Sequence, residues 1–209
     1  MGTFWHWIYV GLIMNRYIIV ALLFVCMSSV SHAQKAPNNM HAMSGVVKGA
    51  VPGFAKKPRY FNSRVAEENL SYLYHQQDVR LVISLDHCND VAKVIRKMNT
   101  NLEPPIEHLC RKIRRATSQY KNNVSLFEEI ASSIGSVKFY IHCRYGAHRA
   151  VTALTGAWIA RQRLTFEEAF EKAGGKKRAF RSKGQKELLN QAKKYAHEKR
   201  GDSGCGEKE

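Results

Sequence analysis

The residues of this sequence that can do chemistry are concentrated at positions 142–149, which read His-Cys-Arg-Tyr-Gly-Ala-His-Arg. A largely apolar, β-prone run (residues 137–141) precedes this stretch, and a second apolar run (residues 151–160) follows it. The pattern predicts a strand, a tight loop and a helix. A loop at a helix N-terminus presents backbone N–H groups and the positive end of the helix dipole. Such a loop binds an oxyanion and favours a thiolate over a thiol.

Three side chains in this stretch suit an anion-binding loop beside a nucleophile. Cys143 supplies sulfur, which is a strong nucleophile as the thiolate. Gly146 permits the backbone conformations that a tight loop needs. Arg149 carries a planar and permanently charged guanidinium that can bind two phosphate oxygens at once. Together they predict a site for a doubly charged oxyanion such as a phosphate group.

The stretch resembles the Cys-x5-Arg motif of cysteine-dependent protein phosphatases, in the His-Cys-x-x-Gly-x-x-Arg form of the dual-specificity branch. The resemblance implies that Cys143 attacks phosphorus and forms a cysteinyl-phosphate intermediate, while Arg149 and the loop amides hold the equatorial oxygens. It implies a supporting role for His142 and substrate contacts from Arg144, Tyr145, Gly146, Ala147 and His148. Two other interpretations remain, a buried cysteine beside a surface arginine and a rhodanese-like sulfurtransferase, whose loop is typically one residue shorter.

One group that the resembling family usually has is missing. The family carries an aspartate general acid on a loop before the cysteine, and such groups accelerate reactions by about 10²–10⁴-fold. This chain has no aspartate between Asp90 and Asp202. The remaining candidate proton donors are Glu103, Glu107 and His148.

The position after the arginine also departs from the family pattern. The family usually has Ser or Thr there, whose hydroxyl helps the thiolate to leave when the intermediate is hydrolysed, and this chain has Ala150. The two departures predict a slow phosphatase that acts on substrates with good leaving groups. The alternative is a catalytically silent phosphate-binding module on the same fold.

The hydrophobic pattern of the chain predicts an α/β fold. We expect a central, mainly parallel sheet of four to five strands flanked by helices, as alternating strands and helices indicate; the resemblance, over about residues 46–173, implies the same fold. A β-branched run at residues 79–85 predicts a buried parallel strand. A capping box between Thr165 and Glu168 predicts a helix start. We expect helical turns at residues 106–111. Further helices are expected at residues 65–77, 90–98, 124–134 (with Ser125 as its N-cap), 150–163 and 185–199, and a strand at residues 113–117.

The N-terminal region has the features of a secretory signal peptide. Arg16, an apolar run and small residues before Ala33 predict cleavage after Ala33 and export to the periplasm or the medium. Translation from Met14 would leave residues 1–13 upstream of the true start. An uncleaved membrane anchor is the alternative, although the apolar run is short for a bilayer span. We therefore expect four regions: a signal peptide (1–33), a linker (34–44), a phosphatase-like domain with a basic C-terminal helix (45–200) and a disordered tail (201–209).

The charge of the chain favours anionic partners. The 209 residues include 33 Lys and Arg against 17 Asp and Glu, a formal net charge of +16. Such a charge attracts polyanions. We expect a phosphorylated substrate (protein, inositol phosphate or phosphoinositide) and an anionic membrane surface at residues 172–200, whose alternative role is a solvated helix packed on the domain. Nucleic acid is disfavoured because no aromatic-rich binding motif accompanies the charge. We expect a monomer without metal or cofactor.

Four cysteines remain after the predicted cleavage site: Cys88, Cys110, Cys143 and Cys205. An exported protein meets oxidising conditions, but the sequence does not give the pairing. Cys88 follows the predicted strand at residues 79–85, so it lies near Cys143 if the two strands are neighbours. Some lipid-directed members of the resembling family have a comparably placed cysteine that forms a reversible disulfide with the nucleophile. This implies a redox partnership of Cys88 with Cys143; the alternatives are a buried thiol or a structural disulfide with Cys110.

Overall fold

The computed structural model describes residues 35–43, 45–54, 60–113 and 120–200. The predicted signal peptide, the predicted C-terminal tail and most of the strand predicted at residues 113–117 lie outside the described residues. Lys35–Glu209 constitute one compact unit. Among the helices of the described part, none is long and apolar enough to cross a bilayer.

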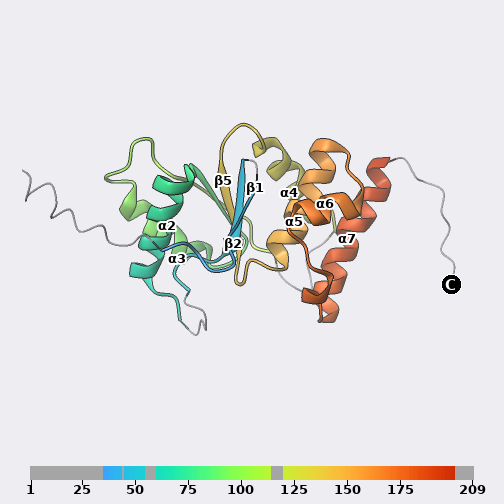
Figure 1. Cartoon of the computed structure of the whole chain (residues 1–209), viewed down its shortest axis with the longest axis horizontal. Helices are drawn as coiled ribbons and strands as arrows, with labels where there is room; N and C mark the ends of the chain where they lie inside the picture. Colours follow the sequence, from blue (N-terminus) through green and yellow to red (C-terminus); the bar gives the residue numbers. More distant parts are fainter. Residues whose placement is uncertain (1–34, 44, 55–59, 114–119, 201–209) are drawn as a thin grey trace, which may run out of the picture. The chain divides into compact units, whose positions relative to one another are not determined.

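A five-stranded sheet forms the centre of the domain (Figure 1). The strand order is β1-β2-β5-β3-β4, with β1 antiparallel to β2 and the other three pairs parallel. This confirms the predicted α/β fold with a mainly parallel sheet of four to five strands. The strands are β1 (His41–Met43), β2 (Val46–Ala50), β3 (Leu81–Ser84), β4 (Glu107–Cys110) and β5 (Phe139–Cys143).

Helices cover both faces of the sheet (Figure 1). One face carries α2 (Ser63–Gln77) and α3 (Cys88–Met98). The other carries α4 (Tyr120–Ser133), α5 (Arg149–Gln162), α6 (Phe166–Lys172) and α7 (Lys183–Arg200), with a short 3-10 turn, η1 (Lys177–Ala179), before α7. Strands β2, β3 and β5 are buried along their whole length because both of their faces are covered.

The helix boundaries follow local sequence signals. Thr165 caps α6: its hydroxyl accepts a hydrogen bond from the Glu168 N–H, and the Glu168 carboxylate accepts one from the Thr165 N–H, which confirms the predicted capping box. Helix α4 begins at Tyr120, so Ser125 lies inside the helix and does not cap it as predicted.

Two segments that were not predicted as strands, one near residue 42 and one near residue 108, form the edge strands β1 and β4 of the sheet. The predicted linker at residues 34–44 contains β1, whose His41 and Ala42 are exposed. The helical turns predicted at residues 106–111 are β4, whose four residues are exposed or half-buried. An edge strand that buries little carries no alternating apolar pattern, so neither strand was visible as one in the sequence.

A disulfide joins Cys88, at the start of α3, to Cys110, at the end of β4, with a Cα–Cα distance of 5.5 Å. The disulfide is the structural pairing that the sequence left open as an alternative, and it corrects the prediction that Cys88 is the redox partner of Cys143, which is free and buried. The physical reason is the register of the sheet. Ser84 in β3 lies beside both Cys110 in β4 and His142 in β5, and Cys88, four residues later in the chain, turns toward β4.

Candidate active site

The predicted strand, loop and helix are present around Cys143. Strand β5 ends at Cys143, and α5 begins at Arg149, so residues 144–148 form a loop at a helix N-terminus. The Gly146 N–H donates to the Cys143 carbonyl at 3.2 Å and closes a turn. The Asn39 side-chain amide donates to the Tyr145 carbonyl at 3.0 Å, which ties the loop to the segment before β1. The loop that follows Cys143 is therefore held by two hydrogen bonds.

Gly146 is the residue that lets this loop lie directly on β2. Its φ angle of +69° is in the left-handed region, which side chains disfavour. A Cβ atom at this position would lie 2.3 Å from the Gly49 carbonyl carbon and 2.7 Å from the Ala50 nitrogen. Both neighbours are backbone atoms of β2, which cannot give way. Any larger residue here would have to push the loop off the sheet.

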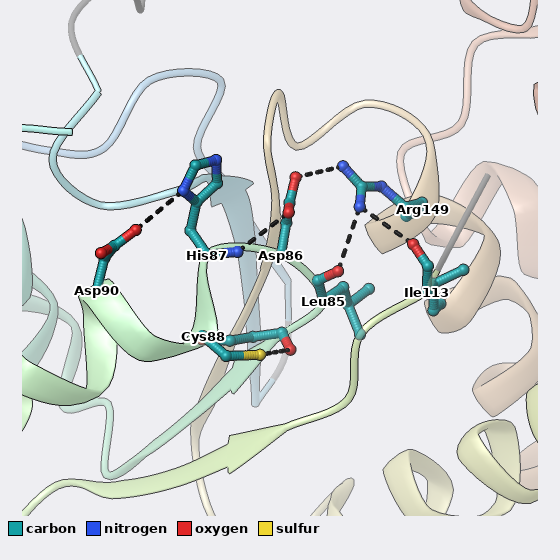
Figure 2. A network of polar contacts seen from close by, with 8 residues as sticks. Leu85, Asp86, His87, Cys88, Asp90, Ile113 and Arg149 are labelled. Atoms are coloured by element: carbon teal, nitrogen blue, oxygen red, sulfur yellow. Dashed lines mark hydrogen bonds and ion pairs between the residues drawn. The ribbon is translucent and has the colours of Figure 1, made fainter. Parts of the chain in front are cut away.

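Arg149 is held in one orientation by three oxygen acceptors (Figure 2). Its Nη2 donates to Asp86 Oδ2 at 2.6 Å, and its Nη1 donates to the Leu85 and Ile113 carbonyls at 3.3 and 3.2 Å. Arginine has five N–H donors. Three of the five N–H groups of Arg149 have partners among the described residues. The remaining two are the Nε–H and one Nη2–H. These two are adjacent on the guanidinium and can bind two oxygens of one phosphate group.

Asp86 positions this arginine and does not act as a proton donor. Burial raises the pKa of the Asp86 carboxyl, but the hydrogen bond and the charge of Arg149 outweigh burial and leave the pKa lowered. The His87 N–H adds a hydrogen bond to Asp86 Oδ1 at 3.1 Å. The carboxyl is therefore ionised at neutral pH. The sequence analysis missed Asp86, although its place directly after a buried parallel strand put it at the edge of the sheet where ligands bind.

Comparisons with known proteins bear on the fold. Neither the protein-family models nor the curated proteins give a match to this chain. Among solved structures, human DUSP28 matches with a TM-score of 0.50 and 15% identity, over 80% of this chain and 99% of that chain. PTPMT1 matches with a TM-score of 0.52 and 17% identity, over 78% and 98% of the two chains. Kinase associated phosphatase, with its catalytic-site cysteine substituted by serine, matches with a TM-score of 0.52 and 16% identity, over 80% and 97%.

The chain has the dual-specificity phosphatase fold. Cys143 and Arg149 lie at the carboxyl edge of the parallel strands of this fold, in the loop between β5 and α5. Ala150, in the first turn of α5, is fully buried. No described group of three or more His, Cys, Asp or Glu side chains is arranged to hold a metal ion in this phosphatase fold.

His142 supports the end of β5 from within the phosphatase core. It is fully buried, and its Nε2 lies 2.7 Å from the Ser84 hydroxyl, which lies 2.8 Å from His108 Nε2. Burial, and secondarily the charge of His108, lowers the pKa of His142 to about 3. The imidazole is therefore neutral at working pH. Its role is to hold β5 against β3 through Ser84.

His148 ties the loop to the turn before α7. Its Nε2 lies 2.7 Å from the Ala179 carbonyl, which can only accept, so Nε2 carries a proton and donates it. Its ring packs edge-on against Phe180 at 5.4 Å between centroids. The Nε2 proton of His148 is therefore engaged by a backbone carbonyl. The substrate contacts predicted for residues 144–148 stay a prediction.

The glutamates considered as proton donors lie at the far end of the sheet. Glu107 begins β4 and lies beside Leu81 at the start of β3, which in turn lies beside Phe139 at the start of β5. Cys143 ends β5, so Glu107 lies at the opposite edge of the parallel strands. Glu103 lies four residues before the start of β4 in the chain. The Glu107 carboxyl therefore cannot reach a leaving group above Cys143.

A small cavity of about 10 Å³ reaches Cys143. Such a volume holds about one water molecule. The loop contributes Tyr145 and His148, and the start of α5 contributes Arg149. The first two turns of α7 contribute Gly184, Gln185 and Leu188. The cavity therefore connects Cys143 and Arg149 with residues of α7.

Proposed function

We propose that this chain is an exported phosphatase that hydrolyses phosphate monoesters through a cysteinyl-phosphate intermediate on Cys143. One observation carries the proposal: a free cysteine ends β5 directly before the loop, and Arg149, which begins α5 directly after the loop, keeps two adjacent N–H groups available. A nucleophile and a bidentate anion-binding group at one helix N-terminus are what phosphoryl transfer to sulfur requires.

The reaction has two steps. In the first, the Cys143 thiolate attacks phosphorus, the bond from phosphorus to the ester oxygen breaks, and the leaving alkoxide takes a proton from water. Arg149 and the loop N–H groups stabilise the charge on the equatorial oxygens. In the second, water attacks phosphorus, the S–P bond breaks, and inorganic phosphate and the thiolate are released. Because no described carboxyl protonates the leaving oxygen, substrates with acidic leaving groups react fastest.

A catalytically silent phosphate-binding module is the second candidate. It is favoured by the ionised state of Asp86, by Glu107 at the far edge of the sheet, and by the buried methyl of Ala150 where a hydroxyl would help to release the thiolate. These features remove groups that speed each step but leave the anion-binding loop intact.

The environment of the enzyme is part of the proposal. The Cys88–Cys110 disulfide supports export, because disulfides persist in oxidising compartments. We propose a phosphorylated protein, inositol phosphate or phosphoinositide as substrate. The basic α7 supports contact with an anionic membrane surface, because lysines and arginines near such a surface each contribute about 1 kcal/mol. We propose a monomeric enzyme.

Turnover of p-nitrophenyl phosphate tests the function, because its good leaving group does not need a general acid. Cys143→Ser should abolish turnover. Arg149→Lys should reduce it by about 10²-fold or more, since lysine cannot bind two oxygens in the geometry of a guanidinium. A silent module would show no turnover, yet would bind phosphate in a manner that Arg149→Ala abolishes. Near-normal activity of Arg149→Lys would remove this arginine from the mechanism.

A further inference from the structure

A second and larger cavity lies beside the loop. Its volume is about 490 Å³, and its walls come from β1, β2, the loop and the segment between α6 and α7. Gly146 and Ala147 of the loop form one wall, and the basic side chains of His41, Lys48 and Lys176 form much of the rest. None of the described residues that line it is acidic. The cavity is therefore large enough for a phosphate group, and the described titratable side chains that line it are all basic.

Lys48 is the most unusual of these side chains. It lies in β2 with 6% of its surface exposed, and no described carboxylate forms an ion pair with it. Burial lowers the pKa of Lys48, the Cys143 thiolate opposes that shift, and Lys176 adds to it. Lys48 is thus within electrostatic reach of both the nucleophile and Lys176. Among the described residues no carboxylate pairs with the buried Lys48 ammonium, and the Cys143 thiolate only partly offsets its burial, so an anionic ligand would stabilise it further.

His41 and Lys176 converge on the same space. Burial lowers the pKa of His41, and the charges of Lys48 and Lys176 lower it further. All three side chains line the cavity. Gly174 brings its backbone close to two of them: a Cβ at this position would lie 3.0 Å from His41 Cδ2 and from Lys48 Cε. Two lysines and an imidazole around one cavity make a site for an oxyanion.

We propose that this cavity binds a second phosphate group of a substrate whose first phosphate group occupies the loop at Cys143. The inference rests on the proposed phosphatase function and narrows its substrate to a polyphosphorylated small molecule of the inositol phosphate class, either free or as a lipid headgroup. Gly146 and Ala147 line this cavity, and their chain neighbours Tyr145 and His148 line the cavity at Cys143, so the same loop contributes to both sites.

Binding measured without turnover tests the second site independently of catalysis. Cys143→Ser protein would be titrated by calorimetry with a myo-inositol bisphosphate and with a myo-inositol monophosphate. When Lys176→Gln is added, the affinity for the bisphosphate relative to that for the monophosphate should fall about tenfold. This is the usual effect of removing one charged hydrogen bond. The matched control is Lys177→Gln, an exposed neighbour that does not line the cavity and should leave the ratio unchanged.

The Lys48→Met variant tests whether Lys48 serves to bind a ligand or to stabilise the fold. A lysine retained for a ligand destabilises the empty site, so Lys48→Met should raise the melting temperature of the unliganded protein while it lowers the affinity for the bisphosphate about tenfold or more. A structural lysine would give a lower melting temperature. If Lys48→Met does not fold, it supports the structural role, and the Lys176→Gln titration then decides.

A histidine NMR signal and a vesicle assay complete the test. The bisphosphate should raise the pKa of His41, because a bound anion offsets the charges of Lys48 and Lys176. Phosphatidylcholine vesicles with a phosphoinositide, compared with the soluble bisphosphate, tell a lipid headgroup from a free ligand. Equal bisphosphate affinities of Lys176→Gln and Lys177→Gln overturn the inference, even if p-nitrophenyl phosphate is hydrolysed. Lys176-dependent binding without any hydrolysis would overturn the phosphatase function and leave the second site standing.

Discussion

Asp86→Asn isolates the contribution of the ion pair that holds Arg149. The side chains of Arg149 and Asp86 are only 12% and 29% exposed, so water screens their interaction only in part. Two unit charges about 4 Å apart interact by about 4 kcal/mol at an effective dielectric constant of about 20. Asparagine keeps one neutral hydrogen bond worth about 1 kcal/mol, and partial screening removes a similar amount, which leaves a net loss of about 2 kcal/mol.

This loss predicts two measurable effects at neutral pH. The melting temperature should fall by about 4–8 °C, as expected for about 2 kcal/mol in a domain of this size. The kcat/KM for p-nitrophenyl phosphate should fall about tenfold or more, because a guanidinium that is free to rotate no longer presents its two N–H groups to the phosphate. Circular dichroism and steady-state kinetics measure the two effects. Asp90→Asn is the matched control, since Asp90 pairs with His87 and not with Arg149.

The stability that the Asp86–Arg149 ion pair contributes should depend on pH. Arg149 keeps the pKa of Asp86 below its unfolded value of about 3.9, so the ion pair stabilises the fold above that pH and ceases to do so as the pH falls through the folded pKa. The difference in melting temperature between the wild type and Asp86→Asn should be constant down to about pH 4 and shrink below it. A variant whose stability and kcat/KM equal those of Asp90→Asn would refute this account of Arg149.

Three further predictions follow from other residues. Gly146→Ala should cost about 3 kcal/mol or more in free energy of unfolding and abolish turnover, while Gly45→Ala, with a similar φ of +73° but nothing within 4 Å, should cost about 1–2 kcal/mol and leave turnover unchanged; urea unfolding compares them. Reduction of the Cys88–Cys110 disulfide should cost about 3 kcal/mol, and dithiothreitol should not affect the melting temperature of a Cys88→Ser, Cys110→Ser double variant; a wild type equally indifferent to dithiothreitol would contradict the disulfide. Ala150→Ser should raise steady-state turnover and shrink any burst of p-nitrophenol; an unchanged rate would mean that breakdown of the intermediate is not the slow step.

The sequence predicted the parts of the site that are local in the chain. The strand, loop and helix around Cys143 and the capping box at Thr165 follow from contiguous patterns, and the structure has them. The buried strand β3 was also predicted, because burial on both faces leaves a continuous apolar run. These elements fix the α/β class and the place of Cys143 at the carboxyl edge of the sheet.

Features that depend on contacts between distant segments were not predicted. The partner of Arg149 is 63 positions earlier in the chain, and no local pattern ties Asp86 to it. The pairing of Cys88 required the position of β4, which was hidden because an edge strand with half-exposed side chains has no apolar alternation. Lys48 and Lys176 are far apart in the chain but line the same cavity. In the sequence, Lys48 is a single lysine within an apolar run and gives no sign of this site.

Detection of the cysteinyl-phosphate tests the central claim most directly. The wild-type protein would be mixed with p-nitrophenyl phosphate, quenched in acid within the first turnover and analysed by intact and peptide mass spectrometry. The account predicts one added phosphoryl group on the peptide that contains Cys143, present in wild type and in Ala150→Ser but absent in Cys143→Ser. Release of p-nitrophenol with no phosphoryl group on Cys143, or with the group on another residue, would contradict it.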